Sequence, residues 1–109
     1  MSTAPPPCTL VQLFLPLRGA DGQPWPRAML DAVRDELTAR FGGATAFVRA
    51  PAAGAWEDPG GEVQRDEVVL VEVMTDRLDR AWWAAYRATL ETRFDQDEVL
   101  IRASAVERL

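Results

Sequence analysis

The sequence contains no histidine and no lysine, and it contains only one cysteine among its 109 residues. Histidine is the commonest zinc ligand and the usual general base, so zinc sites, haem sites and Ser-His or Cys-His catalysis are not expected. The single cysteine, Cys8, cannot form a disulfide within the chain. We therefore expect no metal and no cofactor, and the role of Cys8 stays open.

Long apolar runs and an excess of basic charge are also absent. No run approaches the ~20 residues that cross a bilayer, and the start of the chain has neither the basic segment nor the apolar core of a secretion signal. We expect a cytoplasmic protein that does not bind membranes. The net charge of −5 repels phosphate backbones, so nucleic acid is not an expected partner.

What the chain does contain is the composition of an ordinary packed domain. Hydrophobic residues make up 48% and charged residues 27%, which argues against a disordered or fibrous chain. A length of 109 residues suits a single domain. The proline-rich start predicts a flexible leader over residues 1–7, followed by one domain over residues 8–109.

Four segments have the pattern of β-strands. Residues 9–15 form a short apolar run that Pro16 closes, and residues 44–50 alternate in character. Residues 63–74 contain the most β-prone stretch of the sequence, so we expect this strand in the centre of a sheet. Residues 98–106 form a closing strand.

Two segments have the periodicity of amphipathic helices. The first covers residues 26–41, and its apolar positions recur every four residues at Met29, Val33, Leu37 and Phe41. The pair Gly42-Gly43 predicts a left-handed end to this helix. The second follows a cap at Thr75 or Asp76, with Asp79 adding negative charge near its start. Its apolar stripe comprises Trp83, Tyr86, Leu90 and Phe94.

The order strand, helix, strand, strand, helix, strand is the split βαβ pattern. It predicts an α+β, ferredoxin-like βαββαβ fold, in which a four-stranded antiparallel sheet carries both helices on one face. In the usual strand order of this fold, the last strand borders the first, the first borders the third and the third borders the second. The other face of the sheet is then open.

Strand alternation indicates which side chains point to the open face. If Val11, Leu13, Val69, Val71, Val73 and Ile101 face the helices, the opposite face is half apolar. That face then carries Leu10, Gln12, Phe14, Thr45, Phe47, Arg49, Leu70, Glu72, Met74, Leu100, Arg102 and Ser104. Such a surface on a small protein predicts cover by a second copy or by a ligand, and we expect a homodimer.

One polar row crosses this face. Arg102, Gln12, Glu72 and Arg49 would align across the four strands, which places one carboxylate between cationic groups. These residues would either pair within or across a dimer interface, or form a polar ligand site inside an apolar cavity. A slip of one residue in any strand would dissolve the row, because each slip exchanges the two faces.

Aromatic and acidic residues leave further alternatives open. Trp82 and Trp83 project about 100° apart on a helix, so we expect Trp83 in the core and Trp82 or Trp25 at a helix edge or subunit contact. The alternative is a tryptophan that stacks on a substrate. Trp56 lies between a glycine and a proline-glycine turn, where it either anchors a hairpin or covers a cavity as a ligand-binding residue. The acidic residues between 57 and 67 lack calcium-loop spacing and indicate a solvated face.

Several segments resemble a family of short bacterial proteins of about this length. They are residues 14–17 (FLPL), 41–45 (FGGAT), 54–56 (GAW), 71–74 (VEVM), 94–96 (FDQ) and 99–100 (VL). That family implies a compact bacterial unit and assigns no catalytic residue. At the level of topology, the chain also resembles the dimeric α/β-barrel superfamily, which includes cofactor-independent monooxygenases, isomerases and haem enzymes. The missing histidine departs from the haem members and from many of the monooxygenases.

Two functions fit these observations. The first is a dimeric module that binds a small molecule or a protein partner through the open sheet face, with Gln12, Arg49, Glu72, Arg102 and Trp56 as candidate ligand-binding residues. The alternative is a cofactor-independent enzyme, monooxygenase-like or isomerase-like, acting on a small organic substrate. In that enzyme Glu72 would be the catalytic acid or base, and Arg49 or Arg102 would hold an anionic oxygen. The enzyme requires Glu72 in a cavity that solvent can reach.

Overall fold

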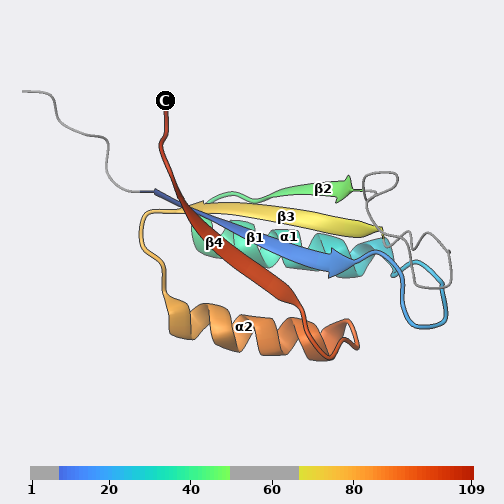
Figure 1. Ribbon diagram of the computed structural model, residues 1–109. Helices are drawn as coiled ribbons and strands as arrows, with labels where there is room; N and C mark the ends of the chain where they lie inside the picture. Colours follow the sequence, from blue (N-terminus) through green and yellow to red (C-terminus); the bar gives the residue numbers. More distant parts are fainter. Residues whose placement is uncertain (1–7, 50–66) are drawn as a thin grey trace, which may run out of the picture.

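The computed structural model describes residues 8–49 and 67–109. Its elements, in chain order, are β1 (Cys8–Pro16), α1 (Arg27–Phe41), β2 (Thr45–Arg49), β3 (Val68–Thr75), α2 (Arg80–Arg93) and β4 (Leu100–Val106) (Figure 1). The strand order is β2-β3-β1-β4, and every neighbouring pair is antiparallel. The predicted ferredoxin-like α+β fold and its strand order are confirmed.

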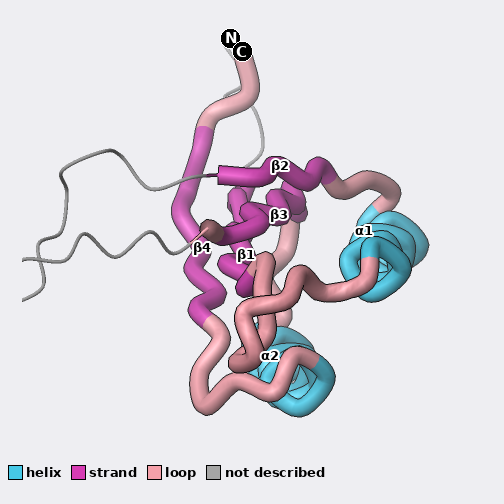
Figure 2. The backbone as a smooth tube through the Cα atoms, turned by 90° about the vertical axis from the view of Figure 1, so that its right-hand side faces the viewer, coloured by secondary structure: helices cyan, strands magenta, loops and turns pink. Residues whose placement is uncertain are grey.

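Both helices lie on one side of the sheet, as the view along the strands shows (Figure 2). The layer between helices and sheet is apolar because one set of alternating strand residues meets the apolar stripes of both helices. Its buried members are Val11, Leu13, Leu15, Val33, Leu37, Val69, Val71, Val73, Trp83, Tyr86, Leu90, Phe94 and Val99. The predicted stripe of α2 is therefore confirmed as core.

An aromatic seam joins the end of α1 to the start of α2. Phe41 stacks on Trp83 with ring centroids 5.3 Å apart, and Trp82 stacks on Tyr86 at 4.9 Å. The guanidinium of Arg40 lies 4.4 Å from the centroid of Trp82. Trp83 is buried in the core whereas Trp82 is half-buried at the helix edge, as the sequence predicts.

The start of α2 differs from the sequence prediction. The helix begins at Arg80, and its N-cap is Asp79, whose carboxylate accepts a hydrogen bond from the Trp82 backbone N–H at 3.0 Å. Thr75 is instead the last residue of β3, and its hydroxyl donates to the Arg77 carbonyl at 2.9 Å. That bond fixes the connection between strand and helix, so neither Thr75 nor Asp76 is the cap.

The end of α1 follows the prediction. Gly42 has a φ of 83°, and its N–H donates to the Thr38 carbonyl, which is the left-handed stop expected of glycine. The first and last strands match their predicted ranges within two residues, and β3 begins at Val68 rather than at residue 63. The predicted leader, residues 1–7, and Trp56 lie outside the described residues, as does the acidic segment up to residue 66.

The two described helices are too short and too polar for either to span a membrane.

Candidate functional site

The open face of the sheet carries one set of alternating residues from each strand. The pairing register places Leu10, Gln12 and Phe14 of β1 opposite Met74, Glu72 and Leu70 of β3, and opposite Ser104, Arg102 and Leu100 of β4. Their alternates on β1 and β3 belong to the core. The face is therefore the mixed polar and apolar surface that strand alternation predicts.

Three residues of the predicted polar row are joined by hydrogen bonds. The Arg102 Nε donates to Gln12 Oε1 at 2.8 Å, and Gln12 Nε2 donates to Glu72 Oε2 at 2.8 Å. The Gln12 amide thus has its oxygen toward the cation and its nitrogen toward the carboxylate. The Arg102 guanidinium also lies 4.9 Å from the ring centroid of Phe14, which restricts it further. These contacts hold the Glu72 carboxylate in one place.

The row must be corrected on β2. Thr45, not Arg49, lies opposite Glu72, and Arg49 lies opposite Val68, at the other end of the strand. Four residues of strand separate the two positions by about 13 Å. The short connection after Gly42 starts β2 at Thr45, and this start sets the register. Alternation alone cannot supply it, because every second residue of β2 shares the face.

A groove opens where this face meets the end of α1. It has a volume of about 890 Å³, and we call it the open-face groove. Its lining comprises Cys8, Leu10, Arg40, Phe41, Gly42, Gly43, Ala44, Thr45, Glu72, Met74, Thr75, Asp76, Arg77 and Arg108. Three arginines and two carboxylates thus share a surface with apolar and sulfur-containing side chains.

Cys8 and Met74 contribute the sulfur atoms of the open-face groove. The Cys8 thiol is buried and lies 4.0 Å from the Met74 Sδ, which it meets as a weak donor. Met74 itself is 40% exposed. The two side chains, with Leu10, give the groove an apolar strip beside the polar row.

Glu72 connects the polar row to the groove. Its side chain is half-buried, it lines the groove, and one of its oxygens accepts the Gln12 amide. Within residues 8–49 and 67–109, no arginine lies at ion-pair distance from this carboxylate. The carboxylate is therefore positioned but not neutralised by an ion pair in that part of the chain.

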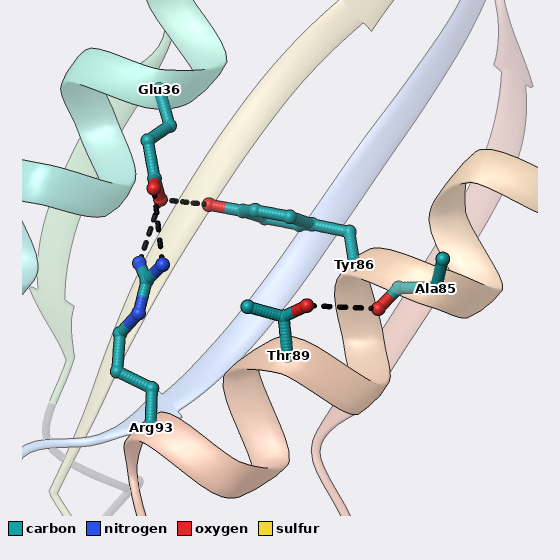
Figure 3. A network of polar contacts seen from close by, with 5 residues as sticks. All are labelled: Glu36, Ala85, Tyr86, Thr89 and Arg93. Carbon is teal, nitrogen blue, oxygen red and sulfur yellow. Dashed lines mark hydrogen bonds and ion pairs between the residues drawn. The ribbon is translucent and has the colours of Figure 1, made fainter.

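The helix side of the molecule holds a different polar network (Figure 3). Glu36 of α1 accepts hydrogen bonds from the Tyr86 hydroxyl at 2.9 Å and from both Arg93 terminal nitrogens at 2.6 and 3.0 Å. The Arg93 hydrogen bond holds the pKa of Glu36 below its usual range. Burial, followed by the bond to Glu36, raises the pKa of the Tyr86 phenol. This network links the two helices, and it lies across the core from the open face.

Within residues 8–49 and 67–109, no group of three or more histidine, cysteine, aspartate or glutamate side chains lies close enough together to hold a metal ion. The structure brings Gln12, Glu72 and Arg102 together and places Arg49 elsewhere on the sheet. Trp56 lies outside the described residues.

Sequence reasoning missed the arginines of the open-face groove. Arg40 lies in the last turn of α1, Arg77 between β3 and α2, and Arg108 after β4. In an antiparallel sheet with this strand order, these three chain positions meet at the same end of the strands. The predicted strand order therefore contained enough information to place these three arginines together.

The fold recurs in a solved structure of a phage SAM lyase in complex with S-methyl-5'-thioadenosine. The two chains superpose with a TM-score of 0.55 at 12% sequence identity, over 99% of this chain and 95% of that chain. No protein-family model and no curated protein matches the sequence. The likeness at this identity concerns the fold alone.

Proposed function

We propose that this chain binds a small organic molecule in the open-face groove. The observation that carries the proposal is the Glu72 carboxylate, which Gln12 holds at the inner wall of the groove with no ion pair from the described residues. Ligand sites commonly combine an apolar lining with a few fixed polar groups, in volumes of about 300 to 1,000 Å³. The open-face groove has both properties.

The lining favours a ligand of mixed character. Leu10 and Met74 offer an apolar surface, and Glu72 accepts a hydrogen bond from a hydroxyl, amine or amide. Arg77 and Arg108 line the same groove and form no ion pair with the described residues, whereas Arg40 is 3.9 Å from the Asp79 carboxylate. We therefore expect an apolar body with one hydrogen-bond donor and one anionic group.

The phage SAM lyase supplies a first probe. Its structure contains S-methyl-5'-thioadenosine, an uncharged molecule with an apolar thioether and a planar base. That ligand supports a small organic molecule as the class to test. It also separates the contribution of the apolar strip from that of the arginines, because it lacks the anionic group that we propose.

A second function, a cofactor-independent enzyme, is favoured by one specific observation. An acid or base must be reachable by its substrate, and Glu72 lines the groove with one oxygen that receives no hydrogen bond from the described residues. A carboxylate that only stabilised the sheet would not need an oxygen that a substrate can reach. Arg77 or Arg108 would then hold an anionic oxygen of the substrate.

Calorimetric titration tests the binding proposal. The probes are S-methyl-5'-thioadenosine, 4-(4-hydroxyphenyl)butyrate and its neutral amide, and the variants are Glu72→Gln and Arg77→Gln. We expect Arg77→Gln to weaken binding of the carboxylate probe about tenfold, since a charged hydrogen bond contributes roughly 1.5 kcal/mol. Binding of the amide probe should not change. Arg27→Gln, at the opposite end of α1 from the groove, is the matched control and should change nothing.

Two outcomes would remove the proposal. One is that no probe binds at 1 mM; the other is that binding persists unchanged in both groove variants. The enzyme is tested separately, by mass spectrometry of a bound ligand after incubation. Glu72→Gln should weaken binding only in part and lose conversion completely, because a glutamine still accepts the Gln12 hydrogen bond but cannot exchange a proton.

A further inference from the structure

A second groove lies on the helix side of the sheet, between α2 and β4. It has a volume of about 270 Å³, and we call it the edge groove. Its lining comprises Val11, Leu78, Arg80, Trp83, Ala84, Arg87, Ile101, Arg102 and Ala103. The polar row and the small-molecule proposal do not depend on it, because it opens on the other side of β4.

The strand that borders this groove is an edge strand. Within the described sheet, β4 pairs with β1 alone, so its outer backbone groups have no strand partner there (Figure 1). Ala103, Ser104 and Ala105 are exposed, and such small side chains leave the backbone accessible. Natural edge strands are usually protected by lysine, proline or a bulge, and this stretch of β4 carries only Arg102. The strand is therefore accessible to another extended chain.

The charge of the edge groove is of one sign. Arg80 and Arg87 line it and no carboxylate does, although the chain as a whole has a net charge of −5. Arg102 also belongs to the lining, but its guanidinium lies on the open face with Gln12 and Phe14. Arg87 is 4.0 Å from the half-buried Glu91, whose carboxylate also accepts the Val99 N–H, so Arg87 is partly neutralised. Arg80 forms no ion pair with the described residues. The groove is thus a local positive site on an acidic protein.

We propose that the edge groove binds an extended acidic segment of a partner protein, which adds to β4 as a fifth strand. The backbone of that segment would pair with the outer edge of β4, and its acidic side chains would meet the arginines of α2. Arg80 and Arg87 are about 10 Å apart along the helix axis. A strand rises about 3.3 Å per residue, so acidic side chains on one face recur about every 7 Å. Those two and four residues apart, at about 7 and 13 Å, lie on either side of the arginine spacing, and the long arginine side chains can reach them.

Charge also selects this occupant over a second copy of the chain. Two copies paired through β4 about a two-fold axis would bring two identical sets of arginines to one interface. Like charges at an interface oppose association, whereas an acidic strand relieves their repulsion. The same charges thus favour an acidic partner and disfavour self-association through this edge.

Fluorescence polarisation with defined peptides tests the proposal. The probe is a labelled peptide of alternating glutamate and threonine, with an alternating lysine and threonine peptide as its control. Two further glutamate peptides carry N-methyl groups, one on each alternate set of amides. Only one set can face β4, so we expect one of these peptides to lose binding and the other to retain it.

The protein variants have a closely matched control. Arg80→Glu changes the first residue of α2, and Arg27→Glu makes the same change at the first residue of α1, outside the groove. We expect Arg80→Glu to weaken the glutamate peptide at least tenfold, Arg87→Glu to weaken it similarly, and Arg27→Glu to leave it within twofold. Circular dichroism of each variant confirms that the fold is retained.

Three results would overturn the proposal. The first is that the glutamate peptide fails to bind. The second is that both N-methylated peptides bind equally, which would show attraction by charge without strand pairing. The third is a change in the light-scattering mass of the peptide-free protein on Arg80→Glu, which would make the edge groove a contact between copies.

Discussion

At the scale of single residues, Glu36 is the polar group with the most side-chain contacts between the helices. Its carboxylate accepts hydrogen bonds from the Tyr86 hydroxyl and from both terminal nitrogens of Arg93 (Figure 3). Such paired hydrogen bonds to an arginine are the strong form of a surface ion pair. Because they favour the charged carboxylate, they also make the stability of the helix pair depend on pH.

Glu36→Gln should lower the free energy of unfolding near neutral pH. The free energy of unfolding of the variant should also fall less steeply as the pH is lowered. The pKa of Glu36 is lowered in the folded state, so its contribution is complete above the unfolded value of about 4.3 and is lost as pH falls through the folded pKa. We expect a loss of roughly 1 kcal/mol at pH 7 and a smaller one at pH 3. Urea denaturation at the two pH values measures it.

The neighbouring variant Asp35→Asn is the control for this measurement. Asp35 is exposed, and among the described residues its ion pair is with Arg34 at 3.7 Å on the same helix. Its substitution should change stability little at either pH. An equal loss at pH 7 and pH 3 for Glu36→Gln would contradict the assignment of the pH dependence to this carboxylate.

The residue scale also shows what could be predicted. Trp83, Tyr86, Leu90 and Phe94 are buried as predicted, because helical period depends only on spacing within one segment. The place of Arg49 could not be predicted, because it depends on which residue of β2 pairs with Glu72. Register between strands is set by connections, and the sequence pattern on either side of the connection leaves several choices open.

At the scale of elements, the start of α2 is fixed by two adjacent side-chain bonds. The Thr75 hydroxyl donates to the Arg77 carbonyl in the connection, and the Asp79 carboxylate caps the helix by accepting the Trp82 N–H. Several residues here are good caps by type, so the sequence alone permits more than one helix start. The choice is made by where β3 ends, which is a property of its pairing with β1.

Asp79→Ala should lower the free energy of unfolding by about 1 kcal/mol, because the Trp82 N–H then loses its acceptor. Asp79→Asn keeps a side-chain acceptor and should retain most of this stability. Asp76→Ala, three residues earlier, is the matched control and should have little effect. Thermal and urea unfolding, followed by circular dichroism, provide the values. If the two alanine variants lose equal stability, Asp79 is not the cap.

At the scale of the whole molecule, the open face leaves two large apolar side chains exposed, although Leu70 on the same face is buried. Met74 and Leu100 are 40% and 50% exposed on this face. The fold was predictable because each element has a local signature, and the order of elements then selects the topology. The open-face groove was not predictable in the same way, since it is formed by the ends of elements that only the folded sheet brings together.

We propose that a second copy covers the part of the open face beyond the groove. Light scattering should then give twice the chain mass of 12.1 kDa. Leu100→Glu should shift the protein toward monomer, because it places a charge in the apolar contact. Leu109→Glu, at the exposed end of the chain, is the matched control and should leave the mass unchanged. A monomeric natural chain, or a dimer insensitive to Leu100→Glu, would contradict this assembly.

The aromatic seam has an optical consequence. Trp82 and Trp83 have ring centroids 4.8 Å apart with perpendicular planes, so each indole is part of the other's immediate environment. Arg40 lies against Trp82 and also lines the open-face groove, and Phe41 stacks on Trp83 while lining the same groove. A molecule that draws Arg40 away from Trp82 therefore changes the emission and the near-ultraviolet dichroism of the seam. The protein thus contains its own label-free indicator of occupancy, read without attaching a dye.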